Sequence, residues 1–227
     1  MIRKIGLLAL ILGLLLAVLS PISVQAEEGL AVRESSVEVD FPLKLTFSLV
    51  AESDVNITEI RLHYTVDRMS FAHVTSEVYL EFDPATTVEA AWSWDMRKTG
   101  GLPPGSRVEY WWTVEDAKGD RIETKPTSVQ VEDARYPWRS LTEGKVTIHW
   151  YEGDESFAQG LMWVAQQVLV RLAESTGAEL ERPVNIYIYA GAQDLQGAMI
   201  FPQEWTGGVA FTRYSTIAIG IAPGEVS

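Results

Sequence analysis

The chain has 227 residues, of which 47% are hydrophobic and 22% charged, a composition typical of folded globular proteins. It carries 31 acidic and 18 basic residues, and the resulting formal net charge of −13 disfavours binding to the phosphate backbone of nucleic acids. The absence of cysteine excludes disulfides, thiolate metal sites and a catalytic thiol. The three histidines, His63, His73 and His149, leave few candidates for metal or base chemistry.

Residues 1–26 have the pattern of a signal peptide. Arg3 and Lys4 precede an unbroken apolar run over residues 5–19, and Ala26 ends a small-residue cleavage pattern. The run is shorter than the roughly 18 to 20 apolar residues that a membrane-spanning helix needs, so a permanent anchor is the weaker alternative. We therefore expect export, a secreted or cell-envelope location and no membrane span in the mature chain.

Residues 27–133 predict a β-sandwich of the immunoglobulin or fibronectin type. Short β-branched and aromatic runs alternate apolar with polar residues and are separated by turn signals. The expected strands cover residues 36–40, 44–51, 58–66, 77–82, 87–95, 107–115, 121–125 and 127–132. The alternation places one face of each strand in a core. The side chains expected in that core include Val88, Ala90, Trp92, Trp94, Val108, Tyr110, Trp112 and Val114.

Trp111 falls on the outer face of its predicted strand, beside Glu109 and Thr113. An exposed tryptophan can stack on a sugar ring or anchor a protein partner, which makes Trp111 a possible partner contact. The alternative is that it packs against the domain that follows. The acidic segment 116–120 is interpreted as a hairpin turn, because it offers too few oxygen ligands for calcium.

A linker over residues 134–144 leads to a second unit, an α/β or α+β domain over residues 145–227. Asp154 is a suitable N-cap for a helix that runs to about Ser175, and Gly177 follows as its stop. The helix is expected to bury one apolar face, made of Phe157, Leu161, Val164, Ala165, Val168, Leu169 and Leu172. The other expected elements are strands over residues 145–151, 184–189, 209–212 and 216–221, and a short helix over 192–199.

The last predicted strand is apolar on both faces, with isoleucines on one and small residues on the other: Ile217, Ile219 and Ile221 against Ala218 and Gly220. A strand of this kind is buried on both sides. The long helix can cover one side, so we expect further polypeptide beyond Ser227 to cover the other and regard the domain as incomplete. The alternative is a small unit closed by dimerisation or by the sandwich.

Four segments of the chain resemble exported bacterial proteins of the peptidase MA-like, gluzincin class. These are residues 136–138 (YPW), 146–154 (VTIHWYEGD), 183–189 (PVNIYIY) and 204–210 (EWTGGVA). The preceding sandwich looks like the accessory domain that often accompanies this class. The resemblance implies that the second unit is the N-terminal sheet of a gluzincin peptidase, the sheet that lies beside the active site.

In that class the next element is a helix with an H-E-x-x-H motif, which binds zinc and activates water. None of the three histidines begins this motif, so we expect no catalytic and no metal-ligating residue in these 227 residues. His149 and Glu152 are no substitute, because an offset of three on a strand points two side chains to opposite faces. The resemblance implies zinc only if a missing C-terminal part is present.

The class also pairs the substrate backbone with an exposed strand. By resemblance the candidate substrate-binding residues are Gly207, Gly208, Val209 and Ala210, although the glycines could instead only shape a bend. The leading hypothesis is the N-terminal fragment of an exported zinc metallopeptidase-like protein, with a peptide or protein substrate and inert by itself. The alternatives are a cell-envelope adhesion protein whose sandwich binds a glycan or protein partner, and a pseudoenzyme without zinc.

Overall fold

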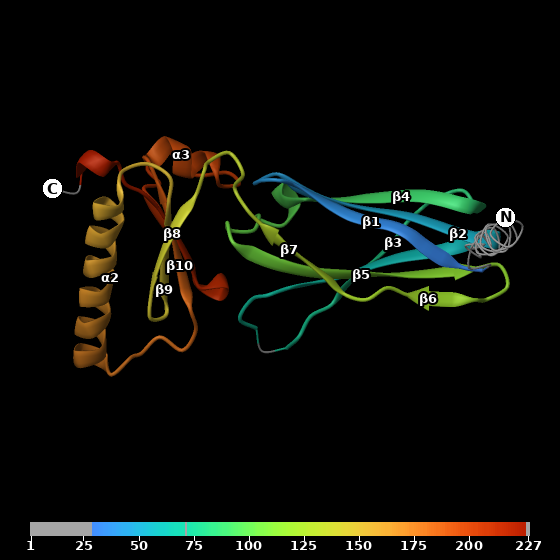
Figure 1. The fold of residues 1–227 in the computed structure, drawn as a ribbon, viewed down its shortest axis with the longest axis horizontal. Coiled ribbons are helices and arrows are strands. Elements are labelled where there is room, and N and C mark those ends of the chain that lie inside the picture. The colour runs from blue at the N-terminus through green and yellow to red at the C-terminus, as the bar shows by residue number, and fades with distance from the viewer. Residues whose placement is uncertain (1–28, 71, 226–227) are drawn as a thin grey trace, which may run out of the picture.

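The structure is a computed structural model, and it describes residues 29–70 and 72–225. The predicted signal peptide, residues 1–26, lies outside the described residues. The described part is mostly β, with 47% of its residues in strands and 18% in helices. Figure 1 shows an elongated molecule with a unit made mainly of strands at one end and a helix-covered sheet at the other.

Seven strands, all paired antiparallel, form the first unit. They are β1 (Ala31–Asp40), β2 (Lys44–Val66), β3 (Ser76–Tyr79), β4 (Ala85–Asp95), β5 (Ser106–Asp116), β6 (Arg121–Glu123) and β7 (Thr127–Val131). The first part of β2 pairs with β1 and β4, and its second part pairs with β3 and β5. The single long strand β2 replaces the two strands predicted over 44–51 and 58–66.

The strand β2 doubles back on itself near residues 52–57, where its register with the neighbouring strands shifts. A straight strand would hold Phe47 and Tyr64 more than about 50 Å apart. Their ring centroids lie 6.2 Å apart instead. The two parts of β2 therefore face each other across a core, and Figure 1 shows β1 and β4 in one layer with β5 and β6 in the other.

The side chains predicted for this core lie inside it. Six of the eight are buried, and the rings of Trp92 and Trp94 are partly buried against the same cluster; the buried six are Val88, Ala90, Val108, Tyr110, Trp112 and Val114. The predicted alternation of faces is confirmed for these strands. Their assignment to the immunoglobulin or fibronectin type stays a prediction.

Five strands in the order β11-β12-β10-β9-β8 form the sheet of the second unit. They are β8 (Arg139–Glu143), β9 (Val146–Trp150), β10 (Val184–Tyr189), β11 (Gly208–Phe211) and β12 (Thr216–Gly220), with helices α2 (Glu155–Thr176) and α3 (Ala192–Gly197). Three central strands run parallel, and the two edge strands run antiparallel to their neighbours. Short 3-10 helices follow β4, β11 and β12, namely η1 (Met96–Lys98), η2 (Thr212–Tyr214) and η3 (Pro223–Glu225).

The strand β8 corrects the predicted linker over residues 134–144. Its residues 139–143 pair with β9, because the chain turns at Gly144 with a φ of 58° and returns along the preceding residues. A short polar segment shows no clear alternation of apolar and polar residues, so the sequence pattern does not predict that it is a strand.

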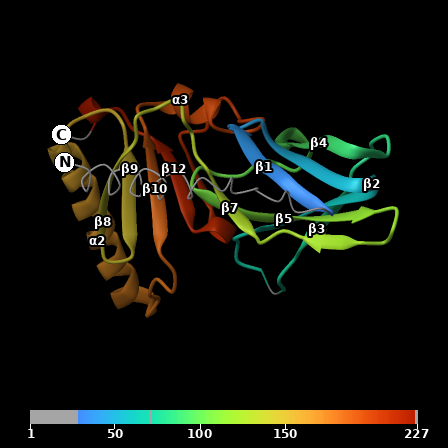
Figure 2. The same cartoon turned by 45° about the vertical axis from the view of Figure 1, so that its right-hand side comes forward.

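The helix α2 begins and ends where the sequence predicts. The carboxylate of Asp154 accepts a 3.0 Å hydrogen bond from the Phe157 amide, and Gly177 ends the helix with a φ of 72°. The predicted buried face is only partly correct, because Val164, Val168 and Leu172 are exposed. The helix lies on the side of the sheet away from the sandwich, over β8 and β9 (Figures 1 and 2).

The two faces of β12 are covered unequally. Thr216 and Ala218 are buried on the face that α3 covers, whereas the isoleucines of the opposite face stay partly exposed. Residues from the sandwich and the following segment, Phe41, Tyr136 and Trp138, also pack on the α3 side. The sandwich thus helps to close one face of the sheet, and the incompletely covered face is the one that carries α2.

No helix in the described ranges is both long and apolar enough to cross a membrane.

Candidate functional site

The candidate substrate-binding residues lie on the free edge of the second sheet. Gly208, Val209 and Ala210 belong to β11, which pairs with β12 on one side and is the outermost strand on the other. Gly207 directly precedes the strand, and its carbonyl accepts a 3.0 Å hydrogen bond from the Gly220 amide. The structure therefore brings all four predicted residues to one sheet edge.

The alternation of an antiparallel ladder fixes which backbone groups point outward. Since Gly207 bonds to Gly220, hydrogen-bonded pairs recur at every second residue, and Val209 directs its amide and carbonyl to Ala218. Gly208 and Ala210 occupy the alternate positions, so their amides and carbonyls point to the open edge. Both residues are exposed.

The backbone conformation at Gly207 and Gly208 does not require glycine. Neither Gly207 nor Gly208 has a φ in the left-handed region, so another residue could adopt either conformation. A Cβ atom at Gly207 would meet nothing within 4 Å, and at Gly208 it would make ordinary contact with Ile219 at 3.7 Å. The missing side chains leave open space beside the edge, which lets another backbone approach closely.

Two exposed aromatic side chains precede β11 and were missed as site residues by the sequence reasoning. Trp205 is 82% exposed and Phe201 is 74% exposed. The amide of the Gln196 side chain donates a 2.9 Å hydrogen bond to the Glu204 carbonyl and so holds their loop. Large aromatics in a segment rich in proline and glycine are the signal that could have identified them.

His149 is a partly buried strand residue, as the sequence predicts. Its Nε2 atom donates to the Asn185 amide oxygen at 3.0 Å, and its ring stacks on Tyr187 with centroids 4.3 Å apart. Burial lowers the pKa of the imidazole, and the bond to Asn185 opposes that shift. Within residues 29–70 and 72–225, no group of three or more histidines or carboxylates is placed to hold a metal ion.

Phenol side chains gather on the face of the sheet that α3 covers, which is also the face of His149. The hydroxyl of Tyr151 donates a 2.6 Å hydrogen bond to the Asp194 carboxylate and accepts one of 2.8 Å from the Ala190 amide. Burial, and then the Asp194 carboxylate, raises the pKa of Tyr151. A phenol of this kind stays protonated and acts as a hydrogen-bond donor, so the bond to Asp194 ties Tyr151 to α3.

Trp111 is half-buried in β5 and not a free platform. Its ring stacks on His63 with centroids 5.3 Å apart and an interplanar angle of 10°. His63 in turn lies 2.9 Å from the Thr113 hydroxyl, and both of these residues are buried. The outer face of β5 is therefore partly covered at the position where the sequence predicts exposure.

Residues 164–227 match the family model of the peptidase MA superfamily. The matched range takes in β10, α3, β11, β12 and the second part of α2, and it supports a peptidase MA-like domain there. No curated protein matches the chain.

Solved structures show only distant similarity to this chain. OgpA from Akkermansia muciniphila is 8% identical over 47% of this chain and 28% of its own, with a TM-score of 0.35. A family 64 β-1,3-glucanase from Paenibacillus barengoltzii is 18% identical over 55% of this chain and 27% of its own, with a TM-score of 0.30. The polysaccharide deacetylase BC0361 from Bacillus cereus is 7% identical over 79% and 58%, with a TM-score of 0.31. The chain thus spans less than a third of the length of OgpA.

Proposed function

We propose that the five-stranded sheet is the substrate-binding sheet of an exported zinc metallopeptidase-like protein of the gluzincin class. The observation that carries the proposal is the free edge of β11, where Gly208 and Ala210 direct their backbone amides and carbonyls outward. The superfamily match over residues 164–227 includes this edge.

An extended peptide can add to this edge as a further strand. Its amides and carbonyls would pair with those of Gly208 and Ala210, and the small side chains there leave its backbone room to approach. Pairing of this kind fixes the register of the peptide. A fixed register presents one peptide bond to the catalytic group, and this positioning is itself a large part of catalysis.

The residues present do not fit a zinc site. His63 is buried within the sandwich layer, and His149 is engaged with Asn185 and Tyr187 in the sheet. No metal-holding cluster of side chains occurs in the described part of the chain. The proposal therefore assigns substrate binding to these residues and derives no hydrolytic step from them; ligands for zinc would be carried by further polypeptide.

An apolar surface beside the edge supports an additional packed element. Ile219 and Ile221 are only partly buried against the α2 cluster, and the helix exposes Val164 and Val168. Exposed apolar side chains that gather on one face of a domain are typical of an interaction site. A helix packed on this face would also stand next to β11, as the proposed arrangement requires.

The natural reading frame and the activity of its product test this proposal. We expect the frame that contains this sequence to encode an H-E-x-x-H helix after β12, and its product to cleave casein in a reaction that a zinc chelator abolishes. A natural product with no such motif, or one that leaves casein intact with zinc bound, would refute it.

Adhesion through Trp111, the alternative function, has no comparable support, because the indole stacks on His63 within the sandwich surface.

A further inference from the structure

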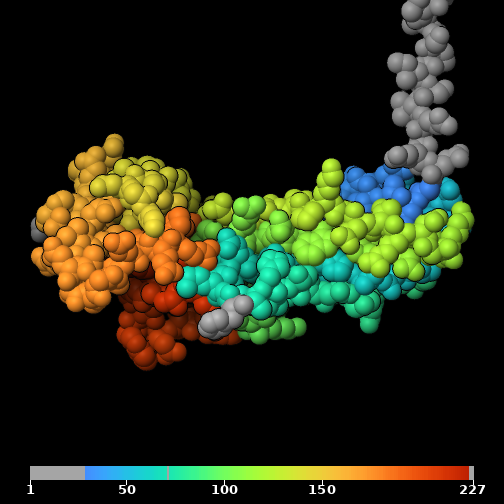
Figure 3. Space-filling view, turned by 90° about the horizontal axis from the view of Figure 1, so that it is seen from below, coloured from blue at the N-terminus to red at the C-terminus, as the bar shows by residue number. Residues whose placement is uncertain are grey.

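A cavity of about 450 Å³ lies where the end of the sandwich meets the second unit. Its lining comes from the ends of β2 and β4, the segments that follow them, the starts of β3 and β5, and Tyr214 of η2. Figure 3 shows the surface of the segment after β2 meeting that of the C-terminal part of the chain. Because η2 directly follows β11, the cavity stands at the end of the edge strand.

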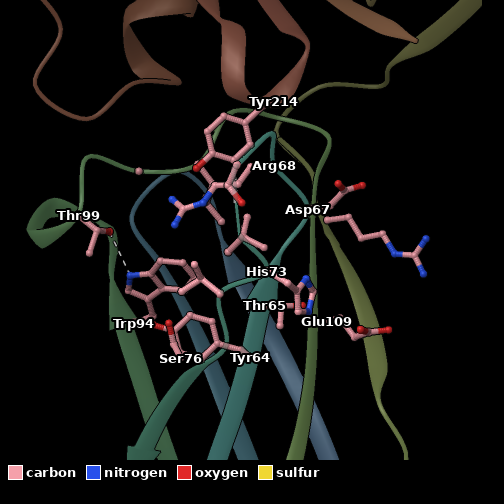
Figure 4. A pocket seen from close by; sticks show the side chains of 16 residues that line it. Tyr64, Thr65, Asp67, Arg68, His73, Ser76, Trp94, Thr99, Glu109 and Tyr214 are labelled. Carbon is pink, nitrogen blue, oxygen red and sulfur yellow. Dashed lines mark hydrogen bonds between the residues drawn. The ribbon is translucent and has the colours of Figure 1, made fainter. Parts of the chain in front are cut away.

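Aromatic rings form two sides of this cavity. Trp94 and Tyr64 lie against each other with centroids 4.8 Å apart, and the Trp94 indole donates a 3.0 Å hydrogen bond to Thr99. Figure 4 shows these two rings on one side and Tyr214 with Arg68 on the other. The indole is thus held in a fixed orientation at the wall of the cavity.

Several polar side chains of the lining have no hydrogen-bond partner among residues 29–70 and 72–225. Thr65 is only 6% exposed, yet its hydroxyl makes no hydrogen bond to any described residue. Arg68 and His73 likewise make neither a hydrogen bond nor an ion pair inside the described ranges. A ligand in the cavity can bond to these polar groups without breaking a hydrogen bond among the described residues.

The charges of other lining residues are already engaged. The carboxylate of Asp67 pairs with Arg182 at 3.1 Å, and the Arg107 guanidinium bonds to the Ser128 hydroxyl at 2.8 Å. Figure 4 shows the side chains of Asp67 and Glu109 turned to the outer side of the lining. Arg68 is therefore the guanidinium that is free to meet a ligand.

The cavity needs both units in place. The Met69 amide donates a 2.7 Å hydrogen bond to the Arg213 carbonyl, and the Asp67 amide donates one of 2.9 Å to the Arg107 carbonyl. These bonds hold the segment that carries Arg68 between η2 and β5. The docking of the two units thus builds a defined site.

We infer that this cavity binds a sugar residue. A pyranose ring has an apolar C–H face, which packs on an aromatic ring, and a rim of hydroxyls that bond to groups such as Thr65, Arg68 and His73. The volume falls in the range of about 300 to 1,000 Å³ that is usual for small-ligand sites.

Other ligand classes fit less well. An apolar ligand would leave the Thr65 hydroxyl and the Arg68 guanidinium unpaired. A nucleotide could stack on Trp94, but its phosphates would meet only one free guanidinium in the lining and a chain of net charge −13. A neutral sugar meets neither penalty.

Titration of the chain with galactose, glucose, N-acetylglucosamine and N-acetylgalactosamine tests this inference, with saturation-transfer NMR and tryptophan fluorescence as readouts. We expect saturable binding of at least one of the four sugars. Arg68→Ala, at an exposed position, and Tyr214→Ala should each weaken it by about tenfold or more, because each removes a direct contact. Trp163→Ala, which alters an exposed tryptophan on α2, should leave the affinity unchanged.

Two results would overturn the inference: no saturable binding of any of the four sugars, or binding that both Arg68→Ala and Tyr214→Ala leave unchanged while thermal unfolding shows that they are folded. The experiment uses no peptide, so its outcome is independent of the role proposed for β11.

Discussion

The phenol of Tyr189 in β10 donates a 3.1 Å hydrogen bond to the carboxylate of Asp133, at the end of the sandwich. Asp133 is fully buried, and its carboxylate also accepts bonds of 2.7 and 2.6 Å from the Arg135 side chain. The Trp138 indole donates a 2.8 Å hydrogen bond to the backbone carbonyl of Asp133. One aspartate therefore holds the connecting segment and the second sheet against the sandwich.

Asp133→Ala should lower the free energy of unfolding by about 2 to 4 kcal/mol, because it leaves the Tyr189 hydroxyl and the Arg135 guanidinium without their acceptor. Urea unfolding followed by circular dichroism measures the change. Asp40→Ala is the matched control, since Asp40 forms an exposed pair with Lys44 at 3.8 Å, and its loss should cost less than about 1 kcal/mol. Equal losses in the two variants would contradict this account of the junction.

Gly105 is a second contact between the units that a single methyl group should disrupt. A Cβ atom at Gly105, whose φ is 78°, would overlap the Tyr187 hydroxyl. Gly105→Ala should therefore cost about 2 kcal/mol or more, part of it backbone strain and part steric overlap. Thermal unfolding compares it with Gly119→Ala, where φ is 83° and no atom lies within 4 Å.

The double variant Gly105→Ala/Tyr187→Phe separates the cost of steric overlap from the cost of backbone strain. Removing the hydroxyl should restore stability relative to Gly105→Ala alone. If Gly105→Ala costs no more than Gly119→Ala, the close approach of the two units at this point is wrong.

The pH dependence of stability should contain a contribution from His149. Burial lowers the pKa of its imidazole in the folded state, so the unfolded chain binds more protons below the ordinary histidine pKa. The contribution is fully present above about pH 6.5 and is lost as the pH falls through the folded-state value. The difference in the free energy of unfolding between the wild type and His149→Gln should therefore shrink as the pH is lowered from 7.5 to 5. A constant difference over this range, measured by urea unfolding, would contradict the burial of a neutral imidazole.

The features that the sequence predicts well are local ones. Alternation places Trp112 inside the sandwich because neighbouring residues on a strand point to opposite faces. The cap at Asp154 and the stop at Gly177 are likewise set by residues within one turn of the helix ends.

The features that the sequence does not predict depend on distant pairing. The reversal within β2 is visible only when its two parts meet different strands, and β8 is a strand only because β9 lies beside it. The cavity joins Tyr64, Trp94 and Tyr214, which no local pattern connects. The edge position of β11 was predicted by resemblance, and its outward amides followed only from the ladder.

Hydrogen exchange checks the orientation of that ladder. The amides of Gly208 and Ala210 should exchange rapidly, whereas the amide of Val209 should be protected by its bond to β12. Protection of Ala210 with fast exchange of Val209 would mean that the ladder is shifted by one residue.

The most direct test of the central claim compares Ala210→Pro with Ala210→Ser in the natural product that carries this sequence, at matched zinc content. Proline removes the outward amide but is tolerated on the free side of an edge strand, whereas serine keeps the amide. We expect Ala210→Pro to lower kcat/KM for peptide hydrolysis by about tenfold or more, and Ala210→Ser to leave it nearly unchanged. Equal activity of the two folded variants would contradict substrate pairing along β11.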